Sequence, residues 1–219
     1  MIDHHILFQA LTHIVPPAHR SAELALALDV ATAAGEQLLT TFGRVTGRPK
    51  PDGSPVTDAD LAADALIAGR LNAAFPADAV LSEESTTTFG GESRVWVVDP
   101  LDGTSNYCHG VPLWGVSLAL VERGRPVVAV SHFPCLRHTF WAVAGHGAWD
   151  GQRRLGAVAS PAISDDDLVT FCSRMPRRFD LHLAGRGRML GSETLSLALV
   201  AAGAVHASLA ATVVKVRSP

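Results

Sequence analysis

The feature that most constrains the fold is a run of four apolar residues, Val95-Trp96-Val97-Val98, which leads directly into the polar sequence DPLDGTSN at residues 99–106. An uninterrupted apolar run of this length is typical of a β-strand that is covered on both faces. Covering both faces of a sheet requires a layer of structure on each side. The sequence therefore predicts a layered fold of helices and strands, with polar residues at the end of a buried strand.

The rest of the chain alternates between helical and strand periodicities. Residues 18–42 repeat Leu and Ala at helical intervals and reach Gly43, which predicts a helix that ends there. Thr57 is placed to cap a second helix over residues 58–74. We predict strands at residues 79–81, 94–99, 113–121, 126–133, 139–143 and 148–149, of which the last four form an antiparallel meander. Later elements are expected as a short helix start at 164–167, a strand near 168–172, and a helix and a strand from residue 192.

Size and composition limit the class of protein. The chain has 219 residues, 47% of them apolar, which excludes a disordered chain and predicts one large domain or two small lobes. We expect an N-terminal α+β lobe over residues 1–150 and a partial C-terminal α/β lobe over 151–219.

A net charge of -3 offers no general attraction for nucleic acid or an anionic membrane. Three scattered cysteines favour small buried thiols in a reducing compartment, so a cytoplasmic protein is expected.

Two further stretches are interpreted as structural segments without a role in binding. Residues 194–214 carry no charge and are long enough to span a bilayer, but their composition changes at Gly203 from Leu- and Ala-rich to Val- and Thr-rich. We therefore predict a buried helix followed by a buried strand, with a membrane span as the disfavoured alternative. Five arginines are expected in a solvated loop, with contact to substrate as the alternative: Arg174, Arg177, Arg178, Arg186 and Arg188.

The end of the buried strand has the chemistry of a binding site. Asp99 and Asp102 are three residues apart across a tight turn in which Pro100 is expected to break strand pairing. Gly103 permits close backbone approach, and Thr104-Ser105-Asn106 begins a short helix whose free N–H groups favour an anion. The sequence thus predicts a cation site beside a phosphate site.

Other acidic residues occur at matching element boundaries. Glu83 and Glu84 follow the preceding strand, and Asp58 and Asp60 begin the helix over residues 58–74. Convergent carboxylates repel one another unless cations or protons are bound, and Mg²⁺ prefers such oxygen ligands. Taken alone, Asp58 and Asp60 are equally well explained as helix-cap acids, and Glu83 and Glu84 are more often part of a solvated turn. Their combined order and spacing favour a metal site.

Three segments together resemble a known family. PVTDAD at residues 55–60, SEES at 82–85 and WVVDPLDGTSNY at 96–107 resemble, in this order, the signatures of the inositol monophosphatase family of metal-dependent sugar phosphatases. The similarity continues through the meander and through GSETL at 191–195 and VAAG at 200–203, so it covers nearly the whole chain. It implies a layered αβαβα sandwich, dependence on Mg²⁺, hydrolysis of a small phosphorylated metabolite, and the homodimer that is common in this family.

The resemblance also implies residue roles. The expected metal ligands are Glu83, Asp99, the carbonyl of Leu101, and Asp102, with Asp60 near a further metal ion. Phosphate would be held by Gly103, Thr104 and Ser105. Catalysis would involve Thr104, paired with Asp60 or Glu83, in activating a water for in-line attack. Lys50 would lie in a loop over the metal ions, with an ordinary surface lysine as an equal alternative. Gly191 and Glu193 are expected near the substrate.

The C-terminal part departs from the family pattern. Family members continue into a Trp-Asp-x-Ala-Ala-Gly motif whose aspartate binds a second metal ion, whereas residues 213–219 read VVKVRSP. The chain is therefore expected to be a C-terminally truncated member without the last part of the C-terminal lobe. A glutamate that contacts inositol in some members would lie near Ala210, where no carboxylate is present.

Two classes of function follow from these residues. The first is a Mg²⁺-dependent phosphomonoesterase acting on a small polyol or sugar phosphate, with histidinol phosphate as an alternative substrate. The second is a catalytically impaired relic or regulatory protein that retains partial metal and phosphate binding.

Overall fold

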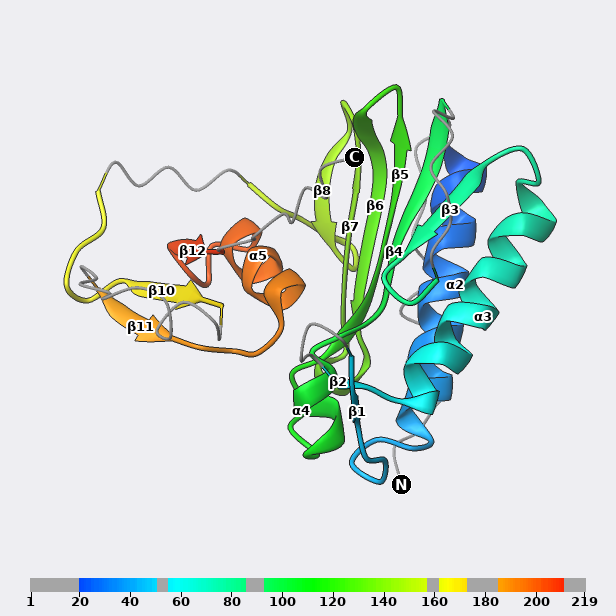
Figure 1. Cartoon of the computed structure of the whole chain (residues 1–219). Helices are drawn as coiled ribbons and strands as arrows, with labels where there is room; N and C mark the ends of the chain where they lie inside the picture. Colours follow the sequence, from blue (N-terminus) through cyan, green and yellow to red (C-terminus); the bar gives the residue numbers. More distant parts are fainter. Residues whose placement is uncertain (1–19, 51–54, 86–92, 157–161, 173–184, 211–219) are drawn as a thin grey trace, which may run out of the picture.

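The main sheet of the molecule has seven strands. A computed structural model of the chain describes residues 20–50, 55–85, 93–156, 162–172 and 185–210 (Figure 1). In spatial order the strands are β3 (Ala79–Ser82), β4 (Arg94–Asp102), β5 (Gly115–Glu122), β6 (Arg125–Phe133), β7 (His138–Val143), β8 (Gly147–Asp150) and β9 (Arg153–Arg154). Strands β3 and β4 are parallel and the other pairs are antiparallel, so the predicted meander is confirmed.

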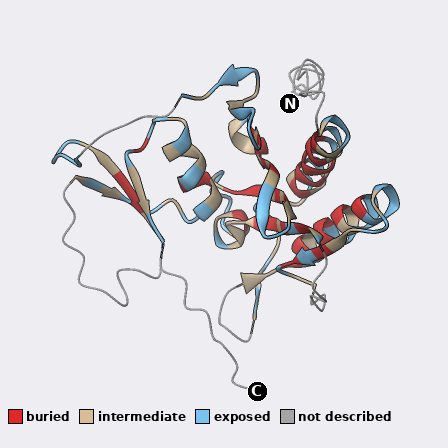
Figure 2. Cartoon of the chain, turned by 90° about the horizontal axis from the view of Figure 1, so that it is seen from above, coloured by how far each residue is buried: buried red, intermediate tan, exposed pale blue. Residues whose placement is uncertain are grey.

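Two long helices cover one face of this sheet (Figure 1). They are α2 (Ser21–Leu39) and α3 (Asp58–Ala74). Buried residues, red in Figure 2, gather along these helices and the neighbouring strands. Among the largest fully buried side chains of this core are Leu24, Leu38, Ile67, Leu71, Trp96 and Leu120. Burial of each such side chain stabilises the fold by about 1.5–3 kcal/mol.

Helix α3 has the predicted bounds, and hydrogen bonds between neighbouring residues fix where it begins. The Thr57 hydroxyl accepts hydrogen bonds from the N–H groups of Ala59 (3.1 Å) and Asp60 (3.3 Å). In return, Asp60 Oδ2 accepts from the Thr57 N–H at 2.9 Å. This reciprocal capping box satisfies backbone donors that a helix start leaves without partners.

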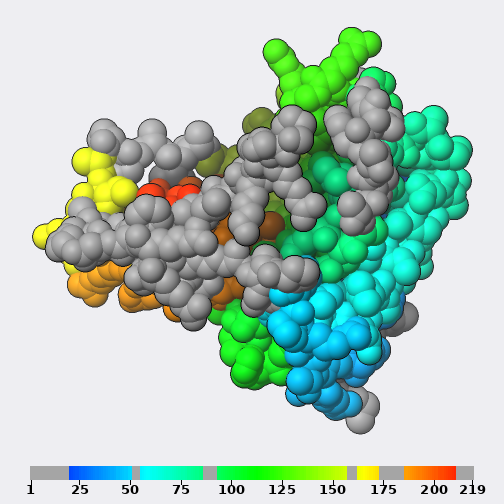
Figure 3. All heavy atoms as spheres, viewed as in Figure 1, coloured from blue at the N-terminus to red at the C-terminus, as the bar shows by residue number. Residues whose placement is uncertain are grey.

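A second, smaller sheet lies beside the first. Its strands are parallel, in the order β11 (Arg186–Arg188), β10 (Leu168–Phe171) and β12 (Ala207–Leu209). Helix α5 (Glu193–Ala201) lies between the two sheets (Figure 1). In the space-filling view, the yellow-to-red segments of this second part lie on the opposite side of the molecule from α3, shown in cyan (Figure 3). The described residues thus supply helix, sheet, helix and sheet layers of the αβαβα sandwich.

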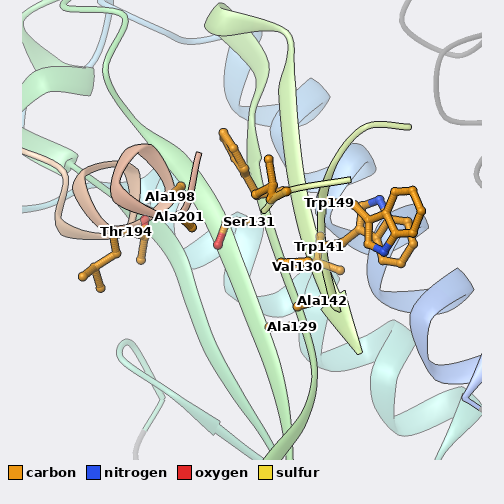
Figure 4. Close-up of a pocket in the computed structure, with 13 residues that line it drawn as sticks. Ala129, Val130, Ser131, Trp141, Ala142, Trp149, Thr194, Ala198 and Ala201 are labelled. Atoms are coloured by element: carbon orange, nitrogen blue, oxygen red, sulfur yellow. The ribbon is translucent and has the colours of Figure 1, made fainter. Parts of the chain in front are cut away.

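The contact between α5 and the main sheet leaves an apolar cavity of about 250 Å³ (Figure 4). Small residues line much of it, including Ala129 and Ala142 on the strands and Ala198 and Ala201 on the helix. On the same helix, the side chain of Leu197 is 57% exposed. The predicted burial of this helix is therefore incomplete, although α5 contacts strands of both sheets and buries Leu195 and Ser196.

Three shorter elements complete the described fold. They are the two-stranded hairpin of β1 (Arg48–Pro49) and β2 (Pro55–Val56), the helix α4 (Thr104–Cys108), and a 3₁₀ turn (Pro134–Leu136). Among the described residues, no helix is both long and apolar enough to cross a membrane.

Several local predictions are corrected. Strand β4 continues past Pro100 to Asp102, with a register shift in its pairing to β5 instead of the expected break. Residues 164–167 form a turn, closed by a hydrogen bond from the Asp167 N–H to the Ser164 carbonyl (3.2 Å), after which the chain enters β10 instead of a helix. Residues 186–188 are strand β11, not loop, because they pair with β10. Of the three thiols, Cys172 is buried, whereas Cys108 and Cys135 are half-buried.

Some predictions lie outside the described residues. These are the first part of the helix over 18–42, the arginines at 174, 177 and 178, and residues 211–219, which include the position compared with the Trp-Asp motif.

Candidate active site

The predicted acidic residues meet at one edge of the main sheet. Because β3 and β4 are parallel, their carboxyl ends lie side by side. Glu83 follows β3, and its N–H donates to the Val98 carbonyl of β4 at 3.2 Å. Asp99 and Asp102 occupy the last part of β4, where the register shift separates them. The topology therefore brings together acids that are far apart in the sequence.

Asp99 has the most perturbed carboxyl group of this edge. Burial raises its pKa well above the usual range, and the negative charges of Asp102, Glu83 and Asp60 raise it further. The Leu101 N–H donates to Asp99 Oδ1 at 3.2 Å and offsets only part of this effect. Asp99 is thus an acid whose ionised form needs a nearby positive charge.

Asp60 and Thr104 form a hydrogen-bonded pair. The Thr104 hydroxyl donates to Asp60 Oδ1 at 3.1 Å and also lies 3.1 Å from the Leu101 carbonyl. The other oxygen of Asp60 accepts from the N–H (2.9 Å) and hydroxyl (2.5 Å) of Thr57. Asp60 is only 1% exposed, and burial raises its pKa. Of the two partners expected for Thr104, Asp60 is the one in contact.

The backbone beside these acids requires glycine at one position. Gly103 has φ of 90° and precedes α4, and a Cβ there would lie 2.9 Å from the Leu113 carbonyl oxygen. The N–H groups of Thr104 and Ser105 belong to the first turn of α4, where a helix offers donors without internal partners. This turn has the form of a small anion-binding loop.

Lys50 lies directly on the acidic edge. Its ammonium group is 2.8 Å from Glu83 Oε1 and 2.6 Å from Glu84 Oε1. Burial lowers the pKa of Lys50, but the hydrogen bonds to the two glutamates outweigh this and raise it. The Lys50 side chain is 17% exposed, and its role over a metal site stays a prediction. In contrast, Asp58 is an exposed acid that pairs with Arg48.

Asp102 makes contacts that sequence reasoning missed. Its Oδ2 accepts hydrogen bonds from the Ser192 hydroxyl at 2.5 Å, the Thr194 N–H at 2.9 Å and the Thr194 hydroxyl. Its Oδ1 accepts from the Glu193 N–H at 3.3 Å. Ser192 was recognisable as a helix start, but no local signal identifies a partner ninety residues earlier.

The two expected substrate-side residues, Gly191 and Glu193, flank this contact. Gly191 has φ of 75°, and a Cβ there would lie 2.8 Å from the side-chain amide of Asn106. Asn106 itself donates to the carbonyls of Leu113 (2.6 Å) and Leu190 (2.8 Å). Glu193 is exposed at the start of α5. The start of α5 is therefore docked against the loop of Gly103 and α4.

The donor set fits a hard divalent cation in its chemistry. Carboxylates and a backbone carbonyl are the oxygen ligands that Mg²⁺ prefers, and a bound cation would offset the burial and the neighbouring charges that raise the pKa of Asp99. Among the described residues, no three Asp, Glu, His or Cys side chains converge tightly enough to hold a metal ion as they stand. Glu83 is engaged by Lys50, and Asp102 by α5.

Comparisons with known proteins agree with this fold. The sequence model of the inositol monophosphatase family matches residues 20–216. Two relatives are a histidinol-phosphatase of Mycobacterium tuberculosis, 44% identical over 60% of this chain and 52% of its own length, and a fructose-1,6-bisphosphatase/inositol-1-monophosphatase of Thermotoga maritima, 33% identical over 78% and 68%. The chain spans about half the length of the curated histidinol-phosphatases that it matches.

Solved structures give the same result for the fold. The IMPase of Thermotoga maritima has a TM-score of 0.74 at 31% identity, covering 84% of this chain and 74% of that one. The suppressor protein SuhB of Bartonella henselae has a TM-score of 0.75 at 30% identity, covering 84% and 76%. The described residues therefore have the fold of these inositol monophosphatase and SuhB structures. The chain belongs to the inositol monophosphatase family.

Proposed function

We propose that this protein is a Mg²⁺-dependent phosphomonoesterase that hydrolyses a small polyol or sugar phosphate in the cytoplasm. The observation that carries the proposal is the hydrogen bond of Thr104 to buried Asp60, next to the Gly103–Ser105 loop and the acidic edge of the main sheet. The proposed metal ligands are Glu83, Asp99, Asp102, the Leu101 carbonyl and, for a further ion, Asp60. A homodimer is part of the same proposal, and light scattering would test it.

The residues of the site divide the work of hydrolysis. When bound, Mg²⁺ supplies positive charge that favours the attacking water and the leaving oxygen. The N–H groups of the Gly103–Ser105 loop hold the phosphate oxygens in line with the water. As the water adds to phosphorus, its proton passes by way of the Thr104 hydroxyl to Asp60, whose burial makes it a better proton acceptor. The ester P–O bond breaks, the leaving alkoxide takes a proton from a solvent water molecule, and Asp60 returns its proton to solvent. Glu83 is the third proposed catalytic group, oriented beside the water.

Histidinol phosphate is the second candidate substrate. The relatives with 41–46% identity, over 107–138 residues, carry the name histidinol-phosphatase. Two relatives that match over longer stretches, at 33% and 36% identity over 178 and 207 residues, carry the names fructose-1,6-bisphosphatase/inositol-1-monophosphatase and inositol-1-monophosphatase. The first group favours an amino alcohol phosphate, and the second favours a sugar or polyol phosphate.

Phosphate release over a panel of phosphomonoesters tests the proposal. The panel contains inositol 1-phosphate, histidinol phosphate and fructose 1,6-bisphosphate, each with and without Mg²⁺. We expect release that requires both Mg²⁺ and Asp99, with Asp99→Asn as the background. If the folded wild-type protein releases no more phosphate than Asp99→Asn, the proposed enzymatic activity is refuted. That result would support a catalytically impaired relic or a regulatory protein.

A further inference from the structure

The two carboxylate oxygens of Asp102 accept different numbers of hydrogen bonds. Three donors converge on Oδ2, from the Ser192 hydroxyl and from both the N–H and the hydroxyl of Thr194. Oδ1 receives a single hydrogen bond, 3.3 Å long, from the Glu193 N–H. A carboxylate oxygen offers about two lone pairs, so Oδ2 is saturated and Oδ1 keeps acceptor capacity.

These donors belong to the second part of the molecule. Asp102 ends strand β4, whereas Ser192 is the N-cap of α5, and Thr194 lies in its first turn (Figure 4 shows Thr194 at that end of the helix). Ser192 is 2% exposed, and its hydroxyl is also the cap acceptor for the Leu195 N–H at 3.1 Å. The Asn106 side chain connects the same two regions by a hydrogen bond to the Leu190 carbonyl. The start of α5 therefore holds one predicted metal ligand by three hydrogen bonds on one oxygen.

We propose that Ser192 and Thr194 are positioning residues that lock Asp102 by Oδ2, leave Oδ1 available to a divalent cation, and so couple cation binding at β4 to the docking of α5. This inference rests on the proposed function, since it takes Asp102 as a metal ligand. Coupling is reciprocal: a cation that binds only the locked Asp102 also stabilises the docked α5.

Variants at Thr194 separate this role from helix stability. Thr194→Val keeps the shape and the N–H but removes the hydroxyl donor, Thr194→Ser keeps the hydroxyl, and Ser192→Ala removes the other donor. The matched control is Ser196→Ala, which removes a side-chain hydrogen bond to the Ser192 carbonyl (2.8 Å) in the same helix without touching Asp102. Mg²⁺ affinity is measured by calorimetry, and exchange of the α5 amides by hydrogen exchange with and without Mg²⁺.

The expected effects follow from the loss of a group that holds a metal-binding carboxylate, which lowers metal affinity about 10- to 100-fold. We expect about a 10-fold weaker Mg²⁺ affinity in Thr194→Val and in Ser192→Ala, wild-type affinity in Thr194→Ser, and less than a 2-fold change in Ser196→Ala. Mg²⁺ should slow amide exchange at the start of α5 in the wild type several-fold more than in Thr194→Val.

The outcomes distinguish this inference from the proposed function. If Thr194→Val, folded by circular dichroism, binds Mg²⁺ as the wild type does, the positioning role is overturned even when phosphate release is normal. If Mg²⁺ affinity changes as expected but no substrate in the panel is hydrolysed, the positioning role stands and the proposed function fails. A wild-type protein that binds no Mg²⁺ overturns both.

Discussion

The two ends of strand β4 hold acidic residues in opposite electrostatic settings. Where the strand begins, two guanidinium groups contact three carboxylates, through ion pairs of Arg20 and Arg94 with Glu23, Asp78 and Glu122. Where the strand ends, Asp99 feels the charges of three other carboxylates, and its pKa is raised. At the first end every one of these acids pairs with an arginine, whereas at the second end Asp99 has no such partner among the described residues.

This difference separates structural from functional acids. Partly buried acids that are paired with arginine connect α2, β4 and β5 and need nothing further. Buried acids that repel one another lower stability, and such perturbed groups concentrate at functional sites. Lys50 offsets the charge of Glu83 and Glu84 but leaves that of Asp99. The comparison favours a structural role for the acids at the first end and agrees with the proposed cation binding at the second.

The largest effect is expected for Asp99→Asn. Phosphate release should fall at least about 1,000-fold, because the variant loses a metal ligand, while the metal-free thermal midpoint should stay equal or rise, because the amide removes a repelling charge. Activity and thermal unfolding are measured on the same sample without and with Mg²⁺. A clear loss of metal-free stability would break the comparison, because it would make Asp99 a structural acid.

At the other end, Arg94→Met should destabilise the protein by about 3–4 kcal/mol. The substitution removes the arginine partner of Asp78, whose side chain is 6% exposed. Glu122 keeps Arg20 but loses Arg94. The matched control is Arg70→Met, which breaks an exposed pair with Asp29 and should cost less than about 1 kcal/mol. Urea unfolding measures both. Equal costs for the two variants would contradict the structural role of the arginine-paired end.

A buried histidine near the acidic end gives a pH-dependent prediction. His132 is 2% exposed, its Nδ1 is 2.9 Å from the Thr139 hydroxyl oxygen, and burial lowers its pKa to about 4. The unfolded chain binds this proton below about pH 6.5, but the native state does not, so stability is lost as the pH falls from 6.5 towards 4. The loss approaches about 3 kcal/mol.

The variant His132→Gln isolates this contribution. Urea unfolding of both proteins at several pH values between 7 and 4 should show a smaller loss of stability in the variant. Parallel curves for the two proteins would mean that His132 titrates normally in the native state.

The smallest effect is expected for Lys50→Met. Without Mg²⁺, removal of this ammonium group leaves Glu83 and the nearly buried Glu84 without their cation and should cost about 1 kcal/mol. Saturating Mg²⁺ should reduce the difference from the wild type, because a bound cation takes over the compensation. Thermal unfolding with and without Mg²⁺ measures this. A difference that is unchanged by Mg²⁺ would show that Lys50 and the cation do not share these carboxylates.

Elements with local signals could be predicted from the sequence. The bounds of α3 follow from Thr57 and Asp60, three residues apart, which cap the helix by themselves. The order of strands in the meander follows from short turns between apolar runs. The turn at residues 164–167 was missed because Asp167 bonds both to Ser164 and, through its carbonyl, to the Arg186 N–H at 2.7 Å. The latter contact belongs to the parallel pairing of β10 and β11, which no local pattern encodes.

The sequence by itself determined which chemistry is present: the acids at strand ends, the glycine whose φ of 90° shapes the loop, and the Thr57 cap that presents Asp60. Tertiary structure alone decided the surroundings of each acid. Lys50 forms an ion pair with Glu83, and the start of α5 donates hydrogen bonds to Asp102. Asp99 is buried beside other carboxylates, which raises its pKa. The physical reason is distance along the chain. Caps and turns act within a few residues, whereas the charge that an acid feels depends on groups that only the packed sheets and helices bring near it.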